Sequence, residues 1–197
     1  MRLLTAVASP FGRKVSMTAR ELNLQLTEEN VDAQKSEEVL AHNPLRQIPV
    51  LILSDGSAVY DSDVICRVLN DYVGGDLYPK DAERGALTRL ALADGLAETS
   101  VGLNNIYRLP EAERSATLME RYRARIARVL DHLEATIEAL SNPVVSIDKI
   151  ATAAAVGHVD LRHGTDWRDG RPGLSRWIDR VAERPSMTET RHPDGRF

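Results

Sequence analysis

A short apolar strand that leads into a Ser-Pro step constrains the fold of this chain more than any other feature. Residues 2–6 have the composition of a buried strand, and Ser9 and Pro10 follow shortly afterwards. Serine is a favoured N-cap, and proline at the first helical position loses no hydrogen bond. The pattern predicts a helix over residues 10–23, whose N-terminus presents a hydroxyl and free backbone N–H groups that can hold an anion.

The segments that follow predict a small α/β domain. We expect, in order, a strand at 26–31, a short helix or turn at 36–42, an apolar strand at 49–53, a hairpin turn at 54–57, a strand at 58–60 and a helix at 62–72. The resulting order, β-α-β-α-β-β-α, matches a thioredoxin-like half, which begins with a right-handed βαβ unit and ends with a hairpin and a helix.

The second half of the chain has a helical pattern throughout. A stretch with two glycines and a proline, residues 74–79, marks the place of a linker. Beyond it, apolar residues at spacings of three and four run from 118 to 140, and residues 150–161 and 174–183 predict further helices. We therefore expect an α/β domain at 1–74, a linker at 75–81, and an all-helical domain at 82–197 that ends in a flexible polar tail at 191–197.

The bulk composition argues against several classes of protein. The 197-residue chain has 25 basic and 29 acidic side chains and a net charge of −4, unlike the basic surface of a general nucleic-acid binder. It has neither an apolar run that could span a bilayer nor a signal-peptide pattern. A single cysteine, Cys66, excludes an intramolecular disulfide. His158 and His163 lack metal-ligating spacing. We expect a cytoplasmic protein without a metal, a nucleic acid or a membrane partner.

Four segments in a fixed order carry a family resemblance. They are residues 9–15, residues 43–51 (Asn-Pro-Leu-Arg-Gln-Ile-Pro-Val-Leu), residues 60–63 (Tyr-Asp-Ser-Asp) and residues 177–187. Together they resemble the glutathione transferase superfamily over most of the chain. The resemblance implies a thioredoxin-like domain followed by an all-α domain, glutathione as a substrate, a small hydrophobic electrophile as the second substrate, and a homodimer.

Ser9 is the expected catalytic residue. Glutathione reacts as its thiolate, and a free thiol has a pKa near ~8.5, so little of it is ionised at neutral pH. A hydroxyl that donates to the sulfur, together with a helix N-terminus, lowers that pKa. A charge-assisted hydrogen bond of about 1.5–3 kcal/mol corresponds to a pKa lower by roughly one to two. The alternative is that Ser9 only caps the helix.

The Ile48–Pro49 step is a candidate for binding the peptide backbone. A proline at the start of an apolar strand has no N–H to donate to a neighbouring strand. This loss is consistent with a cis Ile48–Pro49 bond at a strand edge that faces a ligand. In thioredoxin-like folds such a turn presents the preceding residue to an extended peptide. The resemblance thus implies that Ile48 pairs with the cysteinyl backbone of glutathione. The alternative is an ordinary loop proline.

Asp61 and Ser62 stand where a helix should begin after the hairpin. Either residue is a good N-cap, and capping alone would explain the pair. In the family, an acidic residue followed by serine binds the γ-glutamyl end of glutathione, and the first position is usually glutamate. The resemblance therefore assigns both residues to glutathione.

The resemblance assigns further residues to the two substrates. Lys35 is a candidate for the glycyl carboxylate of glutathione or else a solvated lysine, and Gln47 is a candidate for the glutathione backbone. Phe11 is expected beside glutathione, at the floor of the electrophile site. The electrophile site itself is expected to include Asn104, Tyr107 and Arg108.

The sequence also indicates which class of the superfamily the chain resembles. Tyrosine-type transferases carry a tyrosine at the end of the first strand, but the first tyrosine here is Tyr60. Cysteine-type members need a cysteine near Ser9, whereas Cys66 lies within a predicted helix and is expected to be a small core residue. The chain resembles a serine-type transferase that conjugates glutathione to an electrophile. A non-catalytic binding or regulatory protein and a glutathione-dependent isomerase or dehalogenase stay open as alternatives.

One departure from the family pattern lies at a helix start in the second half. The family has serine or threonine, two further residues and then aspartate. In this chain the third residue after Ser146 is Lys149, and the aspartate, Asp148, lies one position before it. We expect the reciprocal bond of a capping box to be lost or replaced.

Overall fold

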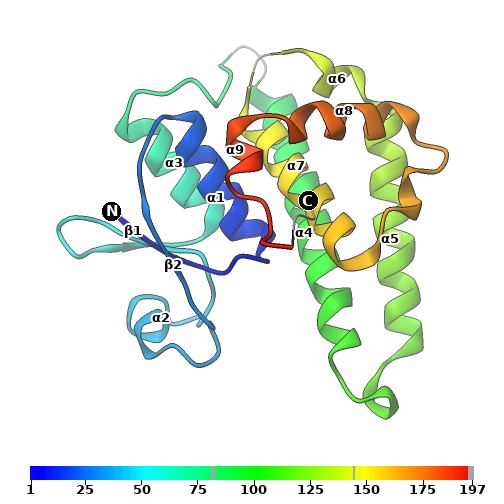
Figure 1. The fold of residues 1–197 in the computed structure, drawn as a ribbon, viewed down its shortest axis with the longest axis horizontal. Helices are drawn as coiled ribbons and strands as arrows, with labels where there is room; N and C mark the ends of the chain where they lie inside the picture. The colour runs from blue at the N-terminus through cyan, green and yellow to red at the C-terminus, as the bar shows by residue number, and fades with distance from the viewer. Residues whose placement is uncertain (81–82, 144, 195–197) are drawn as a thin grey trace.

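The N-terminal part of the molecule is built on a mixed sheet (Figure 1). The computed structural model describes residues 1–80, 83–143 and 145–194. The strands within these ranges are β1 (Arg2–Thr5), β2 (Thr27–Asn30), β3 (Val50–Ile52) and β4 (Ala58–Val59). They lie in the order β2-β1-β3-β4, with β1 parallel to β2 and β3 antiparallel to both β1 and β4.

Helices cover both faces of this sheet. They are α1 (Pro10–Glu21), α2 (Glu37–His42) and α3 (Ser62–Tyr72). Side chains alternate along the strands, so Leu3 and Leu51 pack with α1 and α3, while Leu4 and Val50 pack with Val39 of α2. The predicted order β-α-β-α-β-β-α is confirmed, and with it the α/β, thioredoxin-like class of this part.

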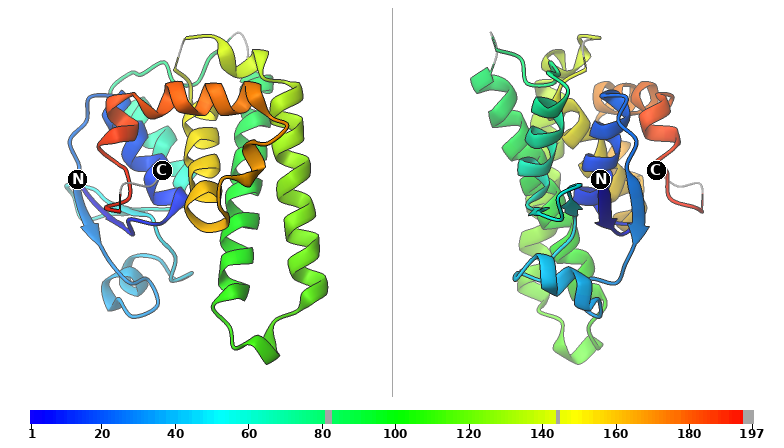
Figure 2. Two further views of the ribbon diagram at one scale, coloured as in Figure 1. Left: turned by 45° about the vertical axis from the view of Figure 1, so that its right-hand side comes forward. Right: turned by 90° about the vertical axis from the view of Figure 1, so that its left-hand side faces the viewer.

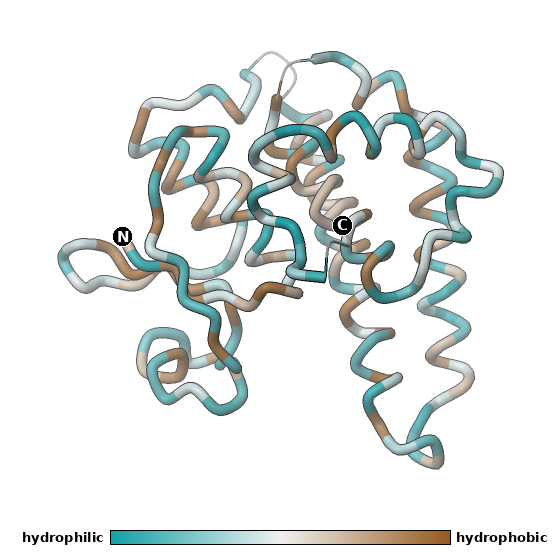
Figure 3. Tube along the Cα trace, in the orientation of Figure 1, coloured by the Kyte–Doolittle hydropathy of each residue, from teal (hydrophilic) through white to brown (hydrophobic). Residues whose placement is uncertain are grey.

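The remainder of the described chain is helical, as predicted. It contains α4 (Glu83–Tyr107), α5 (Ala116–Ala135), α6 (Glu138–Ser141), α7 (Ile147–His163), α8 (Pro172–Ala182) and α9 (Pro185–Thr188), with single turns of 3₁₀-helix at Glu111–Glu113 and Asp166–Arg168. Figure 2 shows α4 and α5 as long helices side by side. Helix α7 runs through the middle of this part and is largely pale to brown in the hydropathy colouring of Figure 3, as its buried Ala-rich sequence requires.

The apolar stripe predicted from 118 to 140 does not form one helix. Helix α5 ends at Ala135, where the hydroxyl of Thr136 donates to the carbonyl of His132 at 2.7 Å. A threonine that bonds its local backbone competes with helix continuation, and the periodicity alone does not reveal this competition. Position 81 of the expected linker and position 82, the expected start of the helical domain, lie outside the described residues.

The capping-box bond at the start of α7 is replaced, as expected. Ser146 makes no side-chain cap bond, and Lys149 instead donates to the carbonyl of Asn142 at 2.7 Å. Asp148 is fully buried and accepts from the Nε of Arg89 on α4 at 2.7 Å. The acidic residue therefore links α7 to α4 instead of capping its own helix.

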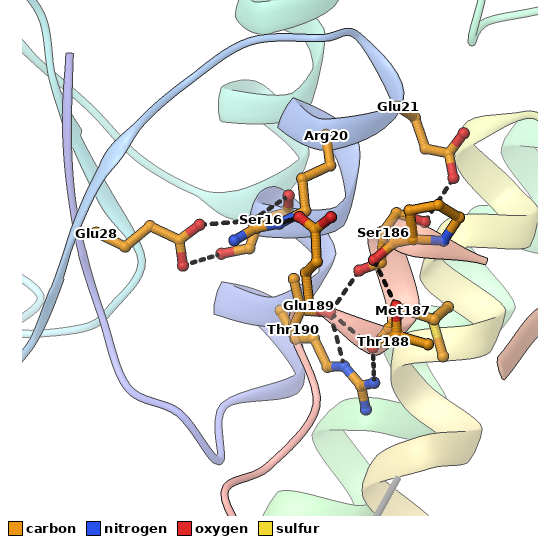
Figure 4. Close-up of polar contacts among 11 residues, drawn as sticks. Ser16, Arg20, Glu21, Glu28, Ser186, Met187, Thr188, Glu189 and Thr190 are labelled. Carbon is orange, nitrogen blue, oxygen red and sulfur yellow. Dashed lines mark hydrogen bonds and ion pairs between the residues drawn. The ribbon is translucent and has the colours of Figure 1, made fainter. Parts of the chain in front are cut away.

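The C-terminal segment is tied to α1 by polar contacts (Figure 4). Arg184 donates two hydrogen bonds to the carboxylate of Glu21, at 2.9 and 2.7 Å, and Arg20 donates to Glu189 at 3.1 Å. Residues 191–194 follow this segment and belong to the tail that was expected to be flexible. Arg191 within them donates to a carbonyl of α8 at 3.4 Å. Residues 195–197 of that tail lie outside the described residues.

A buried lysine joins three helices at the centre of the molecule. Lys14 of α1 is 1% exposed and donates to Asp63 of α3 and, at 2.7 Å, to Asp94 of α4. Burial lowers the pKa of Lys14, but the nearby carboxylates outweigh burial and raise the pKa overall. The ammonium is therefore charged at neutral pH and bridges the α/β part to the helical part.

Replacing Lys14 by alanine leaves two carboxylates facing each other without their cation. We expect Lys14→Ala to lower the free energy of unfolding by about 3 kcal/mol or more, because a buried charge loses its partner. Urea denaturation followed by circular dichroism measures the change.

Lys35→Ala is the matched control for this variant. The side chain of Lys35 is 85% exposed and its contact with Asp32 spans 3.5 Å, so we expect a change below about 0.5 kcal/mol. Equal stabilities of the two variants would contradict a structural role for Lys14.

Candidate functional site

A cleft of about 620 Å³ separates the sheet from the helical part. On the sheet side it is lined by the segments that follow β1, precede β3 and begin α3. The opposite wall is one face of α4, completed by the C-terminal half of α7. Three of the four sequence segments that carry the family resemblance therefore meet at this cleft.

Ser9 lies in this cleft at the N-terminus of α1. Its Oγ accepts a hydrogen bond from the backbone N–H of Gly12 at 3.1 Å. Ser9 therefore caps the helix, as the interpretation of this residue as a cap requires. The same hydroxyl retains its own proton for donation, because accepting the N–H uses only an oxygen lone pair. Capping and donation to a ligand are therefore compatible.

Gly12 allows α1 to lie close against β1. A Cβ at this position would be 1.9 Å from the Oγ1 of Thr5 and 3.3 Å from its Cβ, so a side chain here would require Thr5 or the start of the helix to shift. The close approach fixes Ser9 at the edge of the sheet, facing the cleft.

The Ile48–Pro49 peptide bond is cis, as the sequence analysis anticipated, and it lies at the wall of the cleft. Among the residues that the structure describes, none bonds the backbone N–H or C=O of Ile48. Buried Asn43 holds the preceding turn, since its side chain donates to the carbonyl of Gln47 at 2.9 Å and accepts from the N–H of Leu45 at 3.0 Å. The turn therefore presents a free strand edge to the cleft.

Asp61 and Ser62 form the start of α3 and also line the cleft. The carboxylate of Asp61 caps the helix by accepting from the N–H of Asp63 at 2.8 Å. No hydroxyl contact of Ser62 occurs within the described ranges, and its backbone N–H is one of the unpaired groups at the helix N-terminus. This end of α3 is suited to an anion.

Phe11 and Gln47 line the cleft as expected, but Lys35 does not. The side chain of Lys35 projects into solvent and pairs with Asp32, three residues before it. Arg46 lines the cleft in its place, oriented by an ion pair of 2.8 Å with Glu37. The sequence offered a signal for this arginine, because Arg46 lies within the segment 43–51 that carries the resemblance.

Asn104 of α4 and Arg108, the residue after this helix, line the cleft, whereas Tyr107 does not. Each residue turns an α-helix by about 100°, so Tyr107 faces α5 and the end of α7. Its hydroxyl accepts from Arg123 at 3.0 Å, and its ring lies 6.2 Å from the ring of His163. Tyr107 is therefore a packing residue on the opposite side of α4.

Several polar residues of the helical wall were not predicted from the sequence. Glu98 and Asn105 lie on α4, and His158 and Arg162 lie on α7. His158 is buried, and its Nδ1 is 2.7 Å from the Oγ of Ser100. These residues reach the cleft only through the packing of α7 on α4, for which the sequence has no local signal.

Other sequence expectations concern residues away from the cleft. Cys66 is buried beside the hydroxyl of Thr18 at 3.3 Å, and burial raises the pKa of its thiol to about 12, as suits a core residue. No group of three or more potential metal ligands occurs in the described ranges. Within those ranges, no helix has the length and apolar character needed to cross a membrane.

The chain is similar to known proteins along nearly its whole length. The family model "Glutathione S-transferase, N-terminal domain" matches residues 8–71. The chain is 29% identical over 200 residues to the uncharacterized GST-like protein YibF of Escherichia coli K12, and the match covers 98% of this chain and 99% of YibF.

Solved structures agree with this assignment. A glutathione transferase family member from Pseudomonas fluorescens Pf-5 with bound glutathione has a TM-score of 0.90 and 33% identity, covering 98% of each chain. A structure from the same species with bound S-(propanoic acid)-glutathione has a TM-score of 0.85 and 34% identity, covering 98% of this chain and 100% of the relative. An identity of about one third across an entire shared fold establishes the relationship: the chain belongs to the glutathione transferase superfamily.

Proposed function

We propose that this protein is a glutathione transferase that binds glutathione, stabilises its thiolate at Ser9 and conjugates it to a small electrophile. The observation that carries the proposal is the Ser9 hydroxyl at the N-terminus of α1, in one cleft with the free backbone of Ile48 and the hydroxyl of Ser62. The solved relatives that hold glutathione, or glutathione substituted at sulfur, support the choice of ligand.

Each part of glutathione has a complementary group in the cleft. The N–H and C=O of Ile48 pair with the cysteinyl backbone as an added strand. The γ-glutamyl carboxylate binds at the N-terminus of α3, where Ser62 supplies an N–H and a hydroxyl. The glycyl carboxylate lies toward Arg46, which takes the role expected of Lys35.

This arrangement directs the sulfur to Ser9. Donation by the Ser9 hydroxyl and the positive end of α1 both favour the thiolate over the thiol. The thiolate then attacks an electrophilic carbon with an electron pair, forming the C–S bond. In a substitution the leaving group departs with the electron pair of its bond, and in an addition the displaced π pair takes a proton from solvent.

The resemblance also implies the setting in which the enzyme works. We propose an α/β domain (1–74) and a helical domain (82–197), joined by a linker (75–81), in a cytoplasmic homodimer. A glutathione-dependent isomerase or dehalogenase would share the first half of the mechanism. A non-catalytic relative would bind glutathione without lowering its thiol pKa.

The first test removes the hydroxyl of Ser9. We expect the thiol of bound glutathione to have a pKa well below ~8.5 in the wild type, and a pKa higher by roughly one to two in Ser9→Ala, because one charge-assisted hydrogen bond is lost. The ultraviolet absorbance of the thiolate, followed against pH, measures both values.

Ser115→Ala controls for the loss of a helix cap. Ser115 caps α5 through the N–H of Leu118 and lies outside the cleft, so this variant should leave the bound thiol pKa unchanged. Identical thiol pKa values in wild type and Ser9→Ala would mean that Ser9 caps α1 and does not stabilise the thiolate.

The second test concerns the start of α3. We expect Ser62→Ala to weaken glutathione binding by about tenfold to a hundredfold, since a hydrogen bond to a charged group contributes about 1.5–3 kcal/mol. Binding of the dipeptide cysteinylglycine, which lacks the γ-glutamyl group, should be much weaker in the wild type and little affected by this substitution. Isothermal calorimetry measures the affinity for both ligands. An equal loss of affinity for both would mean that Ser62 contacts a part of the peptide other than the γ-glutamyl group.

A further inference from the structure

His158 of α7 lies where the cleft meets a second, smaller cavity. Among the residues that the structure describes, those that line both spaces are Ala8, Ser9, Pro10 and His158. The smaller cavity has a volume of about 10 Å³, which is roughly the space for one water molecule. His158 therefore brings the helical wall next to the Ser9–Pro10 step.

The packing of α7 on α1 holds His158 at this place. Ala151 of α7 belongs to the same core cluster as Val15 and Ala19 of α1. His158 follows Ala151 by about two helical turns, so both side chains lie on the same face of α7. The face of α7 that packs against α1 therefore carries His158 to the N-terminal end of α1.

The hydrogen bond with Ser100 determines which ring nitrogen of His158 carries the proton. Ser100 is fully buried, and its Oγ lies 2.7 Å from the Nδ1 of His158. Within the described ranges this hydroxyl has no other hydrogen-bond partner. A buried hydroxyl donates its proton where an acceptor is within reach, so Ser100 donates to Nδ1. The proton of the neutral imidazole is therefore assigned to Nε2.

The Nε2–H group of His158 is available to a ligand. In the described part of the chain Nε2 makes no hydrogen bond, and it is not one of the polar atoms that are completely enclosed without a partner. Burial lowers the pKa of His158 to about 3, and nearby cationic groups contribute to the lowering. These groups are Arg162, His163 and Arg108. The imidazole is therefore neutral at physiological pH and offers an N–H donor.

We propose that the Nε2–H of His158 donates a hydrogen bond to the sulfur of glutathione, together with the hydroxyl of Ser9. This inference rests on the proposed function, because it concerns the thiolate that Ser9 stabilises in the same cleft. Two donors share the negative charge of the sulfur, one from the start of α1 and one from the helical wall. The thiol proton passes to solvent, since Ser100 occupies Nδ1 and Nε2 already carries a proton. His158 is thus a second catalytic residue.

The test compares His158→Phe with His158→Gln. Phenylalanine keeps a ring and removes the donor, whereas glutamine keeps an N–H donor. We expect the thiol of bound glutathione to have a pKa higher by roughly one to two in His158→Phe, because a hydrogen bond to a charged group is lost. His158→Gln should restore most of the lowering. The ultraviolet absorbance of the thiolate, followed against pH, measures both values.

His163→Phe is the matched control variant. His163 also lies on α7 and also contacts Ser100, whose carbonyl is 3.0 Å from its Nε2, but it does not line the cleft. The same substitution on the same helix should therefore leave the thiol pKa unchanged. Circular dichroism checks that all three variants are folded.

S-methylglutathione is the control ligand, because it has no thiol to ionise. By calorimetry its affinity for wild type and for His158→Phe should agree within about twofold, since no thiolate is stabilised in either complex. A substitution that only disturbed the shape of the cleft would weaken the binding of this ligand as well.

A measurement on wild type does not depend on the folding of any variant. The ¹⁵N chemical shifts of His158 should place the proton on Nε2, and the resonance of that proton should move downfield when glutathione binds. A proton on Nδ1, or a resonance that glutathione leaves in place, would overturn the inference.

The outcomes separate this inference from the function on which it rests. Equal thiol pKa values in wild type and His158→Phe, with a higher value in Ser9→Ala, overturn the inference alone. A loss of affinity for glutathione and S-methylglutathione at an unchanged thiol pKa also overturns it, because His158 would then only maintain the shape of the cleft. An unshifted thiol pKa in wild type, or no binding of glutathione, overturns the proposed function and the inference together.

Discussion

The buried ammonium of Lys14 is the interaction on which the arrangement of the cleft depends. It lies one helical turn after Pro10, and its partners Asp63 and Asp94 belong to α3 and α4. Each of the three helices that it joins contributes to the cleft: Ser9 caps α1, Ser62 is the first residue of α3, and α4 supplies the helical wall. A buried charge tolerates little displacement of its partners, so this contact fixes the walls relative to one another.

Apolar packing reinforces the same junction. The core cluster that contains Leu3 and Leu51 of the sheet also contains Leu90 of α4 and Ala151 of α7. The sheet and the helical bundle are thus joined by this shared apolar cluster and not only by a polar contact. This apolar contact holds α4 and α7 against the α/β part, on the side of the helical bundle from which residues such as Asn104 and His158 line the cleft.

Local signals in the sequence predicted much of the fold and half of the cleft. The Ser9-Pro10 step, the cis bond at Ile48–Pro49 and the cap at Asp61 all depend on backbone geometry that neighbouring residues dictate, and each occurs as expected. The helical wall depends instead on how helices turn and pack. The rotation of α4 placed Tyr107 outside the cleft, and the packing of α7 on α4 brought in Arg162, which has no local signature.

We expect the cleft to hold glutathione with its sulfur at Ser9, and a crystal structure of the protein with glutathione would show whether it does. In that structure the sulfur should lie within hydrogen-bond distance of the Ser9 hydroxyl. The cysteinyl backbone should pair with the N–H and C=O of Ile48, and the γ-glutamyl carboxylate should lie at the start of α3. A sulfur turned away from Ser9, or glutathione bound outside this cleft, would contradict this expectation.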